Sequence, residues 1–201
     1  MITVVGVGPG ESHFLTLEAQ TAIAAAEVLV GGARHLDTFA TSQHSTRRLD
    51  ADLDGLSVWL RGSMTQRRIV VLASGDPLLY GIGKWLAARF PPAELRIIPG
   101  ISAIQYLCAQ IPLDMNDIYL TSSHGRAPDF DWLLQHDKVA MVTDAITGPR
   151  AIADAILQRG LVRHLIIGEN LSLPAERIYR LPPEAVAQRY DINVVVILNE
   201  R

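Results

Sequence analysis

Short runs of β-branched residues alternate with helical patterns along the chain, and this alternation is typical of parallel α/β proteins. In the first half, the apolar runs that we expect to be strands lie at 2–7, 27–32, 68–75 and 95–100. Alanine-rich or amphipathic segments separate or follow them, and we expect helices at 17–26, shortly after 32, at 83–90 and at 101–111. Helices between successive strands predict parallel pairing with right-handed crossovers.

A second series of elements begins near Asp114. Its expected strands and helices are, in order, 117–123, 129–135, 138–144, 148–160, 164–170, 176–181 and 192–199. The final strands follow one another without a long helix, which predicts a mixed or antiparallel edge of that sheet. We therefore expect two α/β domains, 1–113 and 114–201, while the polar stretch 40–66 yields no assignment.

The composition excludes several classes of protein. The chain has 201 residues, of which 49% are hydrophobic and 19% charged, so it can bury a sizeable core. A formal net charge of −3 provides no basic field for nucleic acid, and no apolar run approaches the ~20 residues of a membrane-spanning helix. A single cysteine, Cys108, and an N-terminus without a basic leader pattern indicate a cytoplasmic protein. The six histidines show no spacing typical of a metal site.

The glycine-rich stretch VGVGPGE at 5–11 follows the first expected strand, where many α/β proteins bind a dinucleotide. The dinucleotide pattern G-x-G-x-x-G requires a third glycine where this chain has Glu11. Pro9 also removes a backbone N–H that a pyrophosphate needs, and the run 27–32 ends in glycines rather than in a ribose-binding carboxylate. A nicotinamide cofactor is therefore disfavoured.

Three loops rich in small residues follow expected strands, at 6–10, 74–77 and 99–103. The carboxyl ends of parallel strands share one edge of the sheet, and ligands bind at that edge. Each loop alone is explained by an ordinary turn, but the three together favour a small-molecule site. Because none has a phosphate-binding pattern, the ligand need not carry phosphate.

The motifs VGVGPGE, SGDPLLYG (74–81) and PGIS (99–102), in this order, resemble those of the tetrapyrrole (corrin and porphyrin) methylases, which use S-adenosyl-L-methionine. The resemblance covers the whole chain, because GENL at 168–171 and the closing run at 192–198 also fit. Within the family, VGGARHL (30–36), SSHGR (122–126) and GENLSLPAERI (168–178) are similar to the branch that methylates C5 of cobalt-precorrin-7. Ser172 departs from this pattern, since glycine is expected after GENL.

The resemblance implies two α/β domains of the tetrapyrrole methylase type with a cofactor cleft between them, a tetrapyrrole substrate that carries cobalt in some members, and a homodimer. It implies that S-adenosyl-L-methionine is bound by Pro9, Gly75, Asp76, Leu79, Ser102 and Ala103. We also expect Gly10 to face the cofactor beside Pro9, and the ring of Tyr80 to stack on it. Met141, Val142 and Asn170 are added because they lie at expected strand ends. Arg34, His35 and Arg126 are expected to bind substrate carboxylates, and His124 and Arg126 are the candidate catalytic residues.

Other functions remain open from the sequence. A tetrapyrrole methylase with another ring-position specificity carries the same loops, and a nicotinamide-dependent oxidoreductase or a ligand-sensing α/β module has the same fold class. The branch also occurs fused to a decarboxylating methylase that acts on C15. We expect that second activity to reside in a separate protein here.

Overall fold

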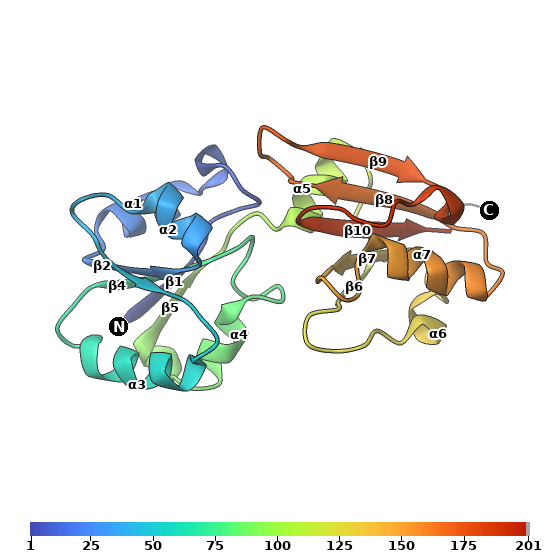
Figure 1. The fold of residues 1–201 in the computed structure, drawn as a ribbon. Helices are drawn as coiled ribbons and strands as arrows, with labels where there is room; N and C mark the ends of the chain where they lie inside the picture. Colours follow the sequence, from blue (N-terminus) through green and yellow to red (C-terminus); the bar gives the residue numbers. More distant parts are fainter. Residues whose placement is uncertain (200–201) are drawn as a thin grey trace. The chain divides into compact units, whose positions relative to one another are not determined.

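The computed structural model describes residues 1–199, and these form two compact units that divide between Ser102 and Ala103. Each unit contains one five-stranded sheet with helices on both faces (Figure 1). The expected α/β fold class is confirmed in both units.

The first unit is a parallel sheet in the order β3-β2-β4-β1-β5. Its strands are β1 (Ile2–Gly6), β2 (Val28–Gly31), β3 (Ser45–Arg48), β4 (Ile69–Ala73) and β5 (Leu95–Ile98). Its helices are α1 (Leu17–Ala24), α2 (Ala33–Phe39), α3 (Leu53–Ser63) and α4 (Ile82–Ala87), with short 3-10 turns at Ser12–Phe14 and Pro92–Glu94. The parallel pairing predicted from the helices between the strands is confirmed.

The central strands β1 and β4 are apolar on both faces because helices cover both sides of this sheet. Val4 and Val71 face α3 and α4, where Leu60 is fully buried. Alternate residues such as Val5 pack with residues of α1 and α2. Figure 1 shows these two helices on the face of the sheet opposite α3 and α4. This two-sided burial fixes the register and holds the carboxyl ends of β1, β4 and β5 at one edge.

The stretch 40–66, which the sequence leaves unassigned, contains β3 and α3. β3 is an edge strand with the polar sequence STRR and little burial, so it lacks the apolar pattern of a strand. α3 begins after Asp52, whose side chain accepts a hydrogen bond from Gly55 N at 2.9 Å. Such an N-cap satisfies one of the unpaired N–H groups of the first turn.

The second unit is a mixed sheet in the order β6-β7-β10-β8-β9. Its strands are β6 (Tyr119–Ser122), β7 (Lys138–Val142), β8 (His164–Glu169), β9 (Arg177–Leu181) and β10 (Asn193–Leu198). β6 and β7 are parallel, whereas β8 and β9 form the antiparallel edge that the sequence predicts. β10 is antiparallel to both β7 and β8 and lies between them, inside the sheet.

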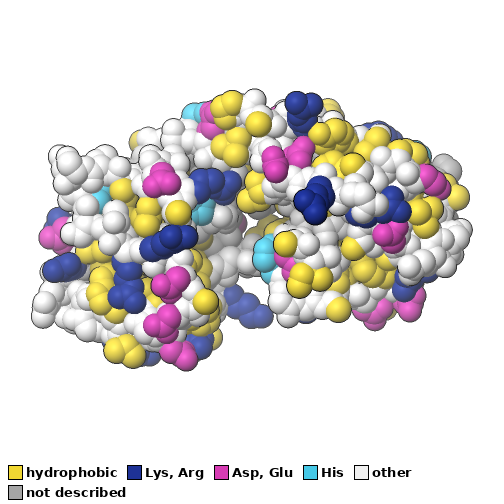
Figure 2. All heavy atoms as spheres, viewed as in Figure 1, with side chains coloured by type: hydrophobic (Ala, Val, Ile, Leu, Met, Phe, Trp, Pro, Cys, Tyr) yellow, Lys and Arg dark blue, Asp and Glu magenta, His cyan; other side chains and the backbone are white. Residues whose placement is uncertain are grey.

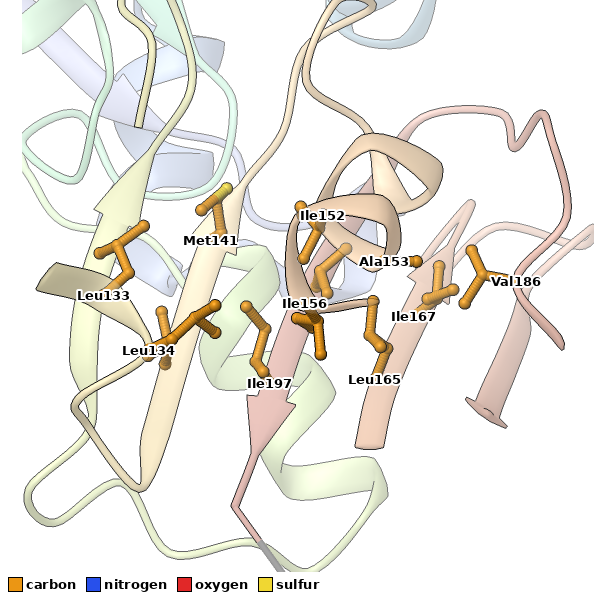
Figure 3. Close-up of a cluster of buried hydrophobic side chains, with 12 residues drawn as sticks. Leu133, Leu134, Met141, Ile152, Ala153, Ile156, Leu165, Ile167, Val186 and Ile197 are labelled. Carbon is orange, nitrogen blue, oxygen red and sulfur yellow. The ribbon is translucent and has the colours of Figure 1, made fainter. Parts of the chain in front are cut away.

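Helices α5 (Ala103–Gln110), α6 (Phe130–Leu133) and α7 (Pro149–Gln158) cover the second sheet. Ile152 and Ile156 of α7 pack with β7 and β8 on one face (Figure 3). α5 packs on the other face, where Leu107 and Cys108 contact Val196 and its neighbours. The sequence places α5 in the first domain because the next break, at Pro112, follows it. In the structure α5 belongs to the second unit, because its apolar side is buried there.

Charged side chains of both signs are interspersed on the face drawn in Figure 2, in agreement with the small net charge. Among residues 1–199, the helices are too short or too polar to cross a membrane.

Candidate functional site

The three glycine loops of the first unit contact one another at the carboxyl ends of β1, β4 and β5. Gly75 N donates a hydrogen bond to Gly8 O at 2.9 Å, and Gly8 N donates one to Gly75 O at 3.3 Å. Gly100 N donates to Asp76 Oδ2 at 3.2 Å, which joins the second loop to the third. The loops that the sequence predicts at one sheet edge are therefore tied into one structure, which we call the loop cluster (residues 6–10, 74–77 and 99–103).

Glycine is required in the loop cluster because backbone packs directly on backbone. A Cβ atom added to Gly6 would lie 2.6 Å from both Gly100 N and Gly75 O. Gly75 itself has a φ of +59°, a conformation that other residues rarely adopt. The glycines therefore explain how closely the three loops approach one another.

Asp76 holds the second and third loops in place. Its Oδ1 accepts from Leu78 N at 2.8 Å, and its Oδ2 accepts from Gly100 N at 3.2 Å. Asp76 is also the only charged residue in the loop cluster. The cluster therefore carries negative charge and no cationic side chain.

The other candidate cofactor residues of the first unit differ in exposure. Pro9, Gly10 and Leu79 are half-buried, and Tyr80 is exposed with a φ of +56°. Ser102 is buried. Leu78 and Ile101 also have exposed apolar side chains in or next to these loops. The sequence does not predict them as site residues, because a single sequence does not show which apolar residues are exposed.

His35 and Arg34 lie in the first turn of α2, at the carboxyl end of β2. The Nε2 atom of His35 lies 3.2 Å from Ser74 Oγ, at the residue just before Gly75. Burial and the nearby Arg34 guanidinium lower the pKa of His35 from 6.5 to about 4. His35 is therefore a neutral imidazole at neutral pH beside the loop cluster, whereas Arg34 is exposed.

We expect the free energy of unfolding to decrease as the pH falls through the window between 6.5 and about 4, in part because of His35. In that window the unfolded chain binds a proton at His35 that the folded chain does not, so acid favours unfolding. Urea unfolding at about pH 7 and about pH 5 measures this effect. His35→Gln is expected to show a smaller decrease than the unchanged protein, and equal decreases would contradict the assignment.

In the second unit, His124 and Arg126 lie in the loop that follows β6. Ser122 Oγ accepts from His124 N at 3.1 Å and lies 3.2 Å from His124 Nδ1. Arg126 donates through Nε to Ser122 O and through Nη2 to Thr121 Oγ1. Both candidate catalytic side chains are exposed, and this loop brings them together.

The candidate cofactor residues of the second unit occupy different environments. Ala103 is the first residue of α5 and is half-buried, as is Val142 at the end of β7. Asn170 directly follows β8 and has a φ of +50°. Met141 is fully buried among the core side chains of this unit (Figure 3), so its side chain is not available to a ligand.

A buried carboxylate organises the loop that contains Asn170. Glu169 accepts from Asp191 N at 2.6 Å and from the Tyr179 hydroxyl at 3.1 Å. Asn170 Nδ2 donates to Asp191 Oδ2 at 3.1 Å. Ser172, in the place where the resemblance expects glycine, has a φ of +63° and keeps the left-handed conformation that glycine adopts freely.

Within residues 1–199, no group of three or more histidine, cysteine, aspartate or glutamate side chains is arranged to hold a metal ion. The candidate polar groups are the loop cluster, the His35–Ser74 pair and the exposed Arg34 in the first unit, and the exposed Arg126 in the second unit.

The comparison with known proteins agrees with the motifs. The family model for tetrapyrrole (corrin/porphyrin) methylases matches residues 1–187. The chain is 52% identical, over all of both chains, to cobalt-precorrin-7 C(5)-methyltransferase of Salmonella typhimurium. It is 32% identical to precorrin-6Y C(5,15)-methyltransferase [decarboxylating] of a Sinorhizobium species, with 98% of this chain covering 48% of that protein.

A solved structure shares the fold at low sequence identity. Uroporphyrin-III C-methyltransferase of Thermus thermophilus, solved with S-adenosylhomocysteine, aligns with a TM-score of 0.76 at 18% identity, covering 98% of this chain and 96% of that one. A family match over most of the chain and a full-length relative at this identity lead to one conclusion: the chain belongs to the tetrapyrrole (corrin/porphyrin) methylases.

Proposed function

We propose that this protein is an S-adenosyl-L-methionine-dependent C-methyltransferase that methylates C5 of a cobalt-precorrin-7 macrocycle in cobalamin biosynthesis. The observation that carries the proposal is the 52% identity to the Salmonella typhimurium enzyme over all of both chains. The ring position rests on this relative, because the fold alone is shared by methylases of different specificity.

The residues of the loop cluster fit S-adenosyl-L-methionine. The cofactor has cationic sulfonium and ammonium groups and no phosphate, and the cluster has one carboxylate, Asp76, and no cationic side chain. Pro9, Gly10 and Leu79 are half-buried, and Tyr80, which follows Leu79 in the chain, is exposed. These loops can therefore offer backbone groups and apolar contacts to an adenosyl group without repelling its cations.

In this proposal, Pro9, Gly10, Gly75, Asp76, Leu79, Tyr80 and Ser102 bind the cofactor in the first unit. Ala103, Val142 and Asn170 are the candidates of the second unit, whereas the buried side chain of Met141 is left out. When bound, the cofactor supplies an electrophilic methyl group. The contribution of the chain is to hold a ring carbon in line with that group, because orientation can supply much of the rate of a displacement.

Exposed cations suit the carboxylate side chains of a tetrapyrrole. Arg34 is a planar guanidinium that can pair with a carboxylate through two hydrogen bonds. Arg126 donates to Ser122 and Thr121, and these bonds hold its head in one orientation. We assign substrate binding to Arg34, His35 and Arg126, and assign positioning or protonation of the macrocycle to His124 and Arg126.

We also propose a homodimer in the cytoplasm and a separate protein for the C15 step. Support for the separate step comes from the Sinorhizobium relative, whose name includes C5 and C15 methylation and of which this chain spans about half.

Calorimetry with S-adenosylhomocysteine, and with NAD(P) as the control ligand, tests the cofactor. Binding of the former alone supports a methylase, whereas binding of NAD(P) alone supports an oxidoreductase. Incubation with the macrocycle and methyl-labelled cofactor, followed by NMR of the product, then locates the new methyl group. A methyl group on another ring carbon would contradict the C5 assignment and favour a methylase of different specificity.

A further inference from the structure

Ser74 and His35 form a pair of protic groups that the cofactor assignment does not use, although His35 is also a candidate for substrate binding. The Ser74 side chain lies 39 positions from His35 in the sequence and 3.2 Å from its Nε2 atom in the structure. β2 and β4 are neighbours in the sheet, so the helix that follows β2 reaches the loop that follows β4. Ser74 is exposed, whereas His35 is half-buried behind it.

The position of the pair relates it to the loop cluster. Ser74 immediately precedes Gly75, which exchanges two hydrogen bonds with Gly8 of the first loop. A Cβ added to Gly31, at the end of β2, would lie 3.6 Å from His35 Cβ and 3.2 Å from Leu72 Cβ, so the glycine leaves room for His35 to lie close to the sheet. Ser74 is therefore an exposed residue at the edge where the cofactor is proposed to bind, with its hydroxyl within hydrogen-bond distance of His35.

His35 is in the neutral form that a proton acceptor requires. Burial and the Arg34 guanidinium keep its pKa at about 4, so the imidazole is neutral at neutral pH. A neutral ring can accept a proton, and it adds no positive charge beside a sulfonium cation.

A conjugated ring carbon that bears hydrogen returns to its conjugated state after methylation only when that hydrogen is removed. The carbon forms its bond to the methyl group while the methyl–sulfur bond breaks and its electron pair stays on sulfur. The methylated ring is then cationic, and it becomes neutral when the hydrogen leaves as a proton and the C–H electron pair returns to the ring. Such a cation is a strong acid, so a base as weak as His35 suffices.

From this geometry we infer that Ser74 and His35 are a proton relay for the methyl transfer, an inference that rests on the proposed function. Ser74 Oγ takes the proton from the ring carbon while its own hydrogen passes to His35 Nε2. His35, with the other proton on Nδ1, becomes an imidazolium. Its low proton affinity then returns the proton to solvent and restores the pair.

The first test needs no cofactor. Nitrogen NMR of the histidine rings reports whether Nε2 of His35 is hydrogen-bonded in the protein alone. Ser74→Ala is expected to shift the Nε2 resonance of His35 and to leave the resonances of His136, a ring in the second unit, unchanged. An unchanged His35 resonance would show that Ser74 and His35 are not hydrogen-bonded, and it would overturn the relay.

The second test measures methyl transfer. His35→Gln is expected to lower kcat by about 10²-fold, the usual contribution of a positioned acid–base group, with the Kd of S-adenosylhomocysteine unchanged. Added imidazole should restore part of kcat, and deuterium at the methylated carbon should slow the variant more than the unchanged protein. His136→Gln is the matched control and should keep full activity.

The outcomes separate this inference from the proposed function. If the unchanged protein methylates the macrocycle and His35→Gln has the same kcat, the relay is overturned and the proposed function stands. If the unchanged protein neither binds S-adenosylhomocysteine nor transfers methyl, the proposed function fails. Should His35→Gln not fold, Ser74→Ala carries the kinetic test, because its hydroxyl is exposed, and full kcat in that variant also overturns the relay.

Discussion

Gly6→Ala is expected to destabilise the first unit by about 3 kcal/mol and to abolish binding of S-adenosylhomocysteine. The added Cβ would lie 2.6 Å from Gly100 N and Gly75 O and 2.7 Å from Gly100 Cα. These are backbone atoms held by the hydrogen bonds of the loop cluster, so no flexible side chain can move aside. Urea unfolding measures the loss of stability, and calorimetry measures the loss of binding.

Gly62→Ala is the matched control. Gly62 lies near the end of α3, and an added Cβ meets nothing within 4 Å. Alanine is a better helix former than glycine, so this variant should gain about 0.5–1 kcal/mol and keep full ligand affinity. If Gly6→Ala proved as stable as Gly62→Ala, the close packing of the three loops would be refuted.

Asp76→Ala is expected to lower the affinity for S-adenosylhomocysteine by about 10-fold or more and to cost about 1–3 kcal/mol of stability. The substitution removes the acceptor of both Leu78 N and Gly100 N, so the second and third loops are no longer tied. It also removes the one negative charge of the loop cluster. Calorimetry and urea unfolding of the same preparation measure both effects.

Asp54→Ala provides the comparison for Asp76→Ala. Its side chain is 95% exposed and its carboxylate lies 3.9 Å from Arg89, a weak surface ion pair. We expect a change in stability below about 0.5 kcal/mol and no change in affinity. If Asp76→Ala also left the affinity for S-adenosylhomocysteine unchanged, the proposal that the loop cluster binds the cofactor would be contradicted.

The sequence predicts those helices and strands whose burial is visible in the apolar pattern of their own residues. β1 and β4 are apolar at every or nearly every position, since both of their faces are covered, and their runs stand out in the sequence. β3 has no such signal, because an edge strand with exposed side chains can be polar. α5 is recognisable as a helix, but only its packing against β10 and β7 shows which unit it belongs to.

The same distinction applies to the candidate site. The convergence of the three loops follows from parallel strands sharing an edge, so topology alone predicts it. The burial of Met141 cannot be predicted from topology, because the side chain of a residue at a strand end can point to either face of the sheet. The contact between His35 and Ser74 depends on which strands are neighbours, and a single sequence does not specify the order of strands in a sheet.

The placement of β10 has a consequence for folding during synthesis. β10 separates β6 and β7 from β8 and β9, and those two pairs have no direct strand pairing with each other. The first unit is continuous in sequence and has all its strands once residue 98 has left the ribosome. The second unit cannot join its two halves until residues 193–198 emerge, so its nascent form exposes two unpaired strand edges. We therefore expect chaperones to bind the second unit of the nascent chain for longer than the first unit.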